Sequence, residues 1–223
     1  MMDQEGTLTR ARLRTPRAAA VAGIVFSILL IISLVLVWVS VPANPQEAGT
    51  WLPRSWKAVN LALNLLPFAG IAFLWFIGVL RDRIGAAEDR FFATVFLGSG
   101  LLFLAMLFAC AAVAGGVIMA YGVAPDKLIE SGIYTFGRTV TYQIMHVYTM
   151  KMAGVFMIST CTLSIRTGIF PRWMAFLGYA LALLLLVSIG YLHWAPLVFP
   201  LWILLISGHI LRANLRPEPA SDH

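Results

Sequence analysis

The sequence predicts an all-α fold: a polytopic bundle of six helices that each cross a lipid bilayer. The 223 residues are 60% hydrophobic and only 12% charged, about half the charged share of a typical soluble domain. The mean hydropathy is +0.86, which leaves too little polar surface to cover a core in water. Long apolar runs alternate with short polar segments, and arginines stand at the ends of those runs. We therefore expect a lipid bilayer as the surrounding solvent.

The first helix is expected at 18–41, after a basic polar segment at 1–17. The apolar run is long enough to span about 30 Å of hydrocarbon. A cleaved secretory signal has an apolar region of only about 7–15 residues, so we interpret this run as a retained helix. Pro42 ends it. A polar loop follows, and the second helix is expected at 58–80 with a kink at Pro67.

The third helix is expected at 91–119, where small residues recur at a spacing of four and allow close helix approach in lipid. The fourth is expected at 138–165 after another polar loop, and the fifth at 172–191 after a tight turn. A sixth, shorter helix is expected at 197–211. If the chain does not cross back between the last two runs, they merge and five helices remain. The polar tail 212–223 completes the chain.

The distribution of positive charge predicts that both termini are cytoplasmic. With the amino end inside, most of the 16 Lys and Arg lie in cytoplasmic segments, as the positive-inside rule requires. We expect a bacterial plasma membrane because it is the simplest assumption, and no address signal guides the choice. The formal net charge of +6 is not arranged as a basic stripe with interleaved aromatics, which argues against nucleic acid and favours anionic lipid headgroups. The outer loops hold only Arg54, Lys57, Lys127 and Arg138.

Polar side chains concentrate in the first half of the fourth helix. At helical spacing, Tyr142, His146 and Thr149 share one face, while Tyr148 and Lys151 lie roughly opposite. A helix that is polar on two sides belongs in the centre of a bundle or beside a water-filled recess. The second helix adds two asparagines at a similar depth. The candidate ligand or vestibule residues are Lys151, His146, Gln143, Tyr142, Tyr148, Asn60 and Asn64.

Lys151 has two interpretations. As a charged group within an apolar helix it would bind an anionic or carbonyl-bearing ligand; alternatively, it extends to the outer headgroups, which we favour. His146 is a weak candidate for a metal or haem b ligand, with His193 as its partner. A hydrogen-bonded structural histidine is the favoured interpretation. We therefore expect no catalytic residue, no metal and no cofactor.

Three classes of function remain open. The favoured one is a non-enzymatic scaffold, accessory or regulatory protein that binds a membrane protein partner or a second copy of itself. It agrees with the short loops and with the lack of Asp or Glu well inside an apolar run, which disfavours an ion-coupled pump. The alternatives are a small transporter or channel subunit with a polar vestibule around Lys151 and His146, and a membrane-bound redox or haem protein.

Overall fold

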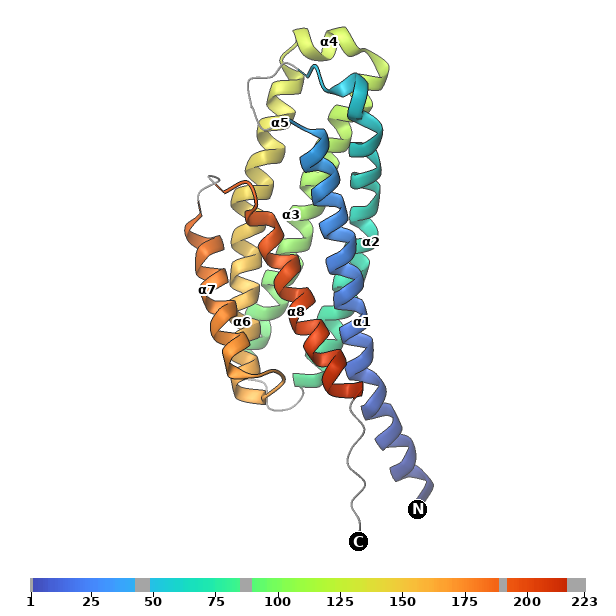
Figure 1. The fold of residues 1–223 in the computed structure, drawn as a ribbon, viewed down its shortest axis with the longest axis vertical. Helices are drawn as coiled ribbons and strands as arrows, with labels where there is room; N and C mark the ends of the chain where they lie inside the picture. Colours follow the sequence, from blue (N-terminus) through green and yellow to red (C-terminus); the bar gives the residue numbers. More distant parts are fainter. Residues whose placement is uncertain (1, 43–48, 85–89, 189–191, 216–223) are drawn as a thin grey trace.

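The computed structural model is all-helical, with no strand in the ranges that it describes. These ranges are 2–42, 49–84, 90–188 and 192–215, with side chains described for 18–42, 49–81, 93–188 and 192–213. The helices, shown in Figure 1, are α1 (Met2–Ser40), α2 (Leu52–Ile84), α3 (Arg90–Val123), α4 (Pro125–Glu130), α5 (Ile133–Gln143), the π-helix η2 (Ile144–Thr149), α6 (Met150–Thr167), α7 (Arg172–Val187) and α8 (Ala195–Leu215).

Four helices are long and apolar enough to cross a membrane. Their apolar stretches are Ala18–Ser40 in α1, Leu52–Arg81 in α2, Ala93–Val123 in α3 and Ala195–Ala213 in α8. The helix α7 is also apolar but has only 16 residues, a rise of about 24 Å. The chain is thus a helical membrane protein by the length and composition of these segments.

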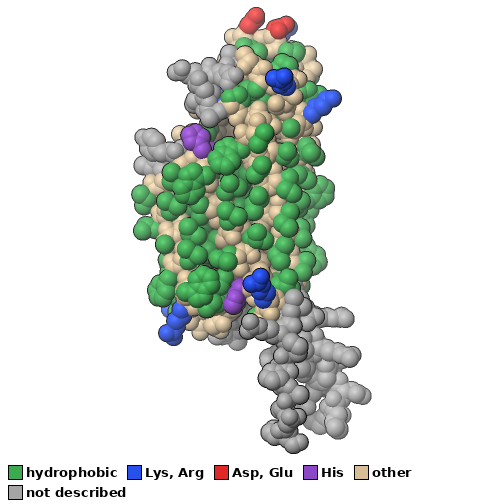
Figure 2. Space-filling view, in the orientation of Figure 1, with side chains coloured by type: hydrophobic (Ala, Val, Ile, Leu, Met, Phe, Trp, Pro, Cys, Tyr) green, Lys and Arg blue, Asp and Glu red, His purple; other side chains and the backbone are tan. Residues whose placement is uncertain are grey.

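The long helices run up and down side by side, and α5, η2 and α6 follow one another in a single direction (Figure 1). The helix α1 packs against α2 and α8, and α6 packs against α3 and α7. The start of α1 and the end of α8 lie at one end of the bundle, and α4 lies at the other. We call these the Arg212 end and the α4 end. Hydrophobic side chains cover the middle of the face shown in Figure 2, with Lys and Arg side chains towards both ends.

Several helices have bounds that differ from those that the sequence predicts. The helix α1 includes most of the predicted polar segment 1–17, and α2 begins at Leu52 instead of about 58. Proline is tolerated in a first helical turn, which accounts for the start of α2 before Pro53 and of α4 at Pro125. The stretches before 58 and around Pro125 were therefore assigned to loops on polarity alone, although both contain helix.

The end of the chain also differs in detail from the sequence interpretation. The fifth predicted helix, 172–191, corresponds to α7, which ends at Val187, and residues 189–191 lie outside the described part. The sixth corresponds to α8, which is longer than the predicted 197–211 and is a helix separate from α7. Residues 216–223 of the predicted tail lie outside the described ranges.

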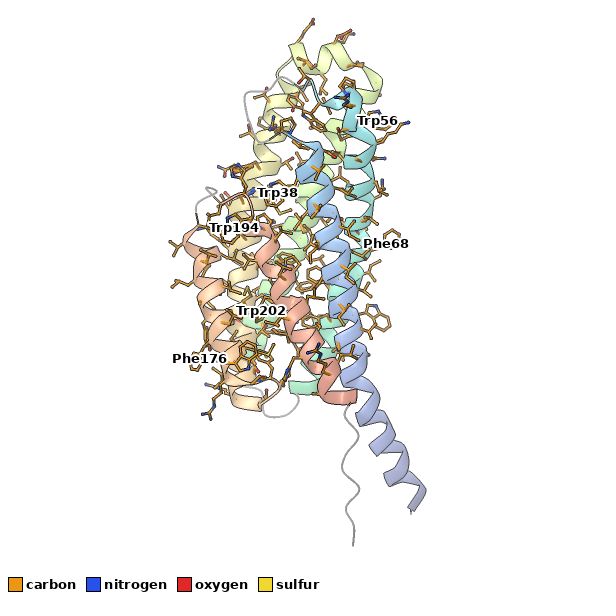
Figure 3. All side chains as sticks on the ribbon, in the orientation of Figure 1. Trp38, Trp56, Phe68, Phe176, Trp194 and Trp202 are labelled. Carbon is orange, nitrogen blue, oxygen red and sulfur yellow. The ribbon has the colours of Figure 1, made fainter. Side chains whose placement is uncertain are left out.

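The centre of the bundle is filled by phenylalanine. Phe73 of α2 is fully buried, and its ring centroid lies 4.6 Å from that of Phe26 and 5.3 Å from that of Phe156. Tilted and edge-to-face contacts of this kind stabilise the fold beyond the contribution from burying the rings. Trp202 of α8 is also buried, whereas Phe68 and Phe176 are exposed (Figure 3). The buried rings of this cluster are Phe26, Phe73, Phe76, Phe96, Phe103, Phe156 and Phe199.

A second, smaller core lies at the α4 end. It unites the start of α2, the end of α3, α4 and α5. Its buried members are Leu52, Val59, Ile118, Leu128 and Tyr134. This cluster explains why α4 and α5 are ordered helices although the sequence there reads as a polar loop: each contributes an apolar side chain that the others cover.

Candidate functional site

The helices α5, η2 and α6 form one continuous rod that contains a π-helical segment. Gln143, Ile144 and Met150 all have right-handed helical backbone angles, so the rod does not break at the junctions. The hydroxyl of Thr149 donates to the carbonyl oxygen of Ile144, five residues earlier, at 2.8 Å. A π-helical turn inserts an extra residue into a helix and is often found at functional sites.

The π-helical segment changes which side chains share a face. At regular α-helical spacing, Tyr142, His146 and Thr149 would line up. In the structure Tyr142 and Gln143 are exposed, His146 is partly buried, and Thr149 is fully buried. The wider turn rotates the residues after it relative to those before it, so the predicted polar face ends at η2.

His146 is held by the residue one turn before it. Its Nδ1 lies 3.2 Å from the carbonyl oxygen of Tyr142, and its ring stacks on the Tyr142 ring with centroids 3.9 Å apart and planes 17° apart. His193, the other weak metal candidate from the sequence, is exposed in the turn just before α8.

Lys151 hydrogen-bonds to the end of a neighbouring helix. Its Nζ donates to the carbonyl oxygen of Leu186 at 3.3 Å, and the side chain is partly buried. Because α7 ends at Val187, the Leu186 carbonyl belongs to the last turn, whose oxygens lack partners within the helix. An ammonium group is favoured there by the helix dipole. The arrangement gives Lys151 a helix-capping contact, a third possibility beside the ligand site and the extended side chain.

The two asparagines of α2 do not join this group. Asn60 and Asn64 are both exposed, and the Nδ2 of Asn64 donates to the carbonyl oxygen of Asn60 at 2.8 Å within the same helix. Tyr148 is exposed as well. Of the seven predicted residues, the structure therefore brings together Tyr142 and His146 by direct contact. It places Lys151 against α7 and leaves the asparagines on a separate surface.

A hydrogen-bond network at the α4 end was missed by reasoning from sequence. The Nε1 of Trp51 donates to the hydroxyl of Tyr134 at 2.7 Å, and Arg138 donates to the same hydroxyl at 3.3 Å. Arg138 also donates to the carbonyl oxygen of Pro42 at 2.6 Å. The network joins the segment after α1, the turn just before α2, and α5. In the sequence, the only sign of this network is that Arg138, at the predicted start of the fourth helix, follows Tyr134 by four residues.

The described residues offer limited metal chemistry. No three His, Cys, Asp or Glu side chains come together as a possible metal site in the part of the chain that the structure describes. Comparison with protein-family models, curated proteins and solved structures gives no match. The class of protein that the fold defines is therefore a helical membrane protein, and any finer assignment rests on its own geometry.

Proposed function

We propose that the chain crosses a bacterial plasma membrane six times, with both termini cytoplasmic, and acts as a non-enzymatic scaffold, accessory or regulatory protein. The observation that carries the functional part is an exposed apolar surface at the α4 end. Met119, Val123 and Phe136 are 77%, 87% and 72% exposed there. Met119 and Val123 line a hollow of about 430 Å³ whose lining is mainly apolar and comes from the end of α3, from α4 and from the start of α5. Phe136 follows three residues after Ile133, another residue of that lining.

The length of α3 indicates that this surface lies beyond the hydrocarbon. Its apolar stretch has 31 residues, a rise of about 46 Å, against a hydrocarbon thickness of about 30 Å. If the opposite end of α3 begins at the cytoplasmic boundary, then Met119 and Val123 project on the far side. Apolar side chains exposed together in water are typical of a surface that binds another protein.

The six-crossing arrangement is supported by charge at the two ends. Described arginines at the Arg212 end include Arg81, Arg166, Arg172 and Arg212, all exposed. The antiparallel course of the helices in Figure 1 puts the start of α1 at that same end. The positive-inside rule then assigns the Arg212 end to the cytoplasm and the α4 end to the opposite side.

Topology is tested with a membrane-impermeant maleimide on intact cells. Lys127→Cys, in exposed α4, should be labelled from outside, whereas Arg172→Cys, at the start of α7, should react only after lysis. The two native cysteines are buried and give little background. Labelling of Arg172→Cys alone in intact cells would reverse the orientation, and labelling of both would contradict the crossing pattern.

Function is tested by purification from the native membrane in mild detergent. We expect a stoichiometric protein partner whose recovery falls with Phe136→Ala, because that change removes an apolar contact at the α4 end. Phe176→Ala is the matched control. Phe176 is 63% exposed on α7, away from the α4 end, so its loss should leave recovery of the partner unchanged. Solute flux in liposomes that depends on Lys151, with no partner found, would instead support the transporter or channel alternative. A Soret band in the purified protein would support the haem alternative.

A further inference from the structure

The α4 end carries a projecting ring and a hollow on one surface. The hollow of about 430 Å³ is lined by Met119 and Val123 of α3 and by Ile133 at the start of α5. Phe136 lies one turn after Ile133 and is 72% exposed. In a two-fold dimer both copies use the same patch, so the ring of each copy can enter the hollow of the other. The surface therefore has the two parts that a self-complementary shape requires.

The charges at this end are complementary to one another as well. The helix α4 carries Asp126, Lys127 and Glu130, all exposed, and Lys127 lines the hollow. Figure 2 shows acidic and basic side chains together at this end. When two copies meet through the patch, each lysine faces a surface with two carboxylates, which is attractive, whereas a patch of one sign would repel its own copy.

The same surface continues along an exposed face of α3. Four residues at helical spacing form this face, and all are exposed: Ala112, Gly116, Met119 and Val123. A Cβ atom added at Gly116 would meet no other part of the described chain within 4 Å, whereas one at Gly115 would reach Leu63 of α2 at 4.0 Å. Ala112 and Gly116 are therefore left open, and small residues at this spacing let a second helix backbone approach closely.

We propose that the occupant of this surface is a second copy of the chain, bound in a two-fold arrangement. The Phe136 ring of each copy packs in the hollow of the other, and the two α3 helices approach at Gly116. Lys127 of each copy pairs with the acidic side chains on α4 of the other. The two-fold axis stands along the membrane normal, because both copies share one orientation in the membrane. This inference rests on the proposed scaffold function, since it names the partner of the same α4-end surface.

The inference is tested with two differently tagged copies of the full chain, co-expressed and purified through one tag in mild detergent. The unaltered copies should retrieve each other. Gly116→Leu in both copies should lower retrieval by at least about tenfold, because the added side chain holds the two α3 helices apart.

Gly78→Leu is the matched control for that change. Gly78 is exposed on α2, and a Cβ atom there also meets no other part of the described chain within 4 Å, so retrieval should not change. The space around both glycines is open within a single copy. Both variants should therefore keep the unfolding temperature of the unaltered protein, which separates loss of the dimer from loss of the fold.

A charge exchange distinguishes a second copy from any other partner. Lys127→Glu leaves α4 with acidic charges only, and Asp126→Asn combined with Glu130→Lys leaves it with basic charges only. Each variant should fail to retrieve its own kind. The acidic and basic variants should retrieve each other, because opposite charges then meet across the interface. A mixed pair that associates no better than either self-pair would contradict the proposal.

The outcomes also separate this inference from the proposed function. Unaltered copies that do not retrieve each other, or equal losses in Gly116→Leu and Gly78→Leu, would overturn the second copy. If a different protein is recovered instead and is lost with Phe136→Ala, the scaffold proposal stands without the dimer. If only lipid accompanies a monomer, both proposals fail.

Discussion

The bundle centre and the α4 end are stabilised in different ways. At the centre, buried phenylalanine rings contact one another with centroids 4.6–6.3 Å apart, as for Phe26 with Phe73 and with Phe103. At the α4 end, Trp51, Tyr134 and Arg138 are joined by directed hydrogen bonds. Van der Waals packing suffices inside a bilayer-spanning bundle. A short helical cap with a small core needs side-chain hydrogen bonds to fix its loops, since little apolar area is available there.

The largest effect is expected from removing an aromatic ring at the bundle centre. Phe73→Ala should lower the free energy of unfolding by about 3–5 kcal/mol, because the cavity left by a fully buried ring is added to the lost burial. The measurement is unfolding in mixed micelles titrated with a denaturing detergent.

Phe68→Ala is the control for that change. Phe68 is 63% exposed on the same helix, so its replacement should alter the free energy of unfolding much less than Phe73→Ala does. Equal effects of the two substitutions would show that the phenylalanine cluster does not stabilise the bundle beyond the contribution of any apolar residue.

The next effect concerns the network at the α4 end. Tyr134→Phe removes the hydroxyl that accepts from Trp51 and Arg138, and should lower the free energy of unfolding by about 1–3 kcal/mol. Hydrogen exchange should quicken in residues 49–57 and remain unchanged around Phe73, which would sharpen the contrast between the two regions.

A double-mutant cycle isolates the hydrogen bond itself. Trp51→Phe combined with Tyr134→Phe should cost less than the sum of the single changes, with a coupling of about 1 kcal/mol. Strict additivity would contradict the direct contact between the two side chains.

A smaller effect is expected at Lys151. Lys151→Met removes the donor to the Leu186 carbonyl oxygen and should destabilise by about 0.3–1 kcal/mol through fraying of the last turn of α7. Faster exchange confined to the end of α7 is the expected signature. A gain in stability would mean instead that the cost of burying the ammonium exceeds the value of its hydrogen bond.

The smallest effect is expected on the exposed face of α2. Asn64→Leu removes only an intrahelical hydrogen bond and should change the free energy of unfolding by no more than about 0.5 kcal/mol. Its denaturation curve should overlay that of the unaltered protein. A loss of several times that size would place Asn64 in the polar cluster that the sequence suggested.

Sequence periodicity and composition predicted the helical membrane architecture well. The all-helical fold and the apolar stretches of α1, α2, α3 and α8 follow from apolar runs as long as the hydrocarbon core is thick. A run of that length forms a helix in lipid, because a helix satisfies its own backbone hydrogen bonds. The helices at the α4 end were harder to predict. Their polar residues resemble a loop, and what orders them is a shared small core whose members, such as Leu52 and Leu128, are far apart in the chain.

The candidate site was only partly predictable, because it depends on a local departure from α-helical geometry. Spacing rules assume 3.6 residues per turn, so they place Thr149 on the face of Tyr142. The π-helical segment η2 breaks that assumption and buries Thr149. Likewise, the sequence gave no sign of the hydrogen-bond partner of Lys151, which is a carbonyl oxygen 35 residues away.

The most direct test of the closed bundle uses the two native cysteines. Cys161 is fully buried in α6, and Cys110, 5% exposed in α3, contacts the carbonyl oxygen of Thr141 close to η2. If the bundle interior is dry, neither thiol should react with a small water-soluble methanethiosulfonate reagent in native membranes, and both should react after denaturation. Rapid modification of either thiol in the folded protein would reveal a water-filled path through the bundle and contradict the scaffold proposal.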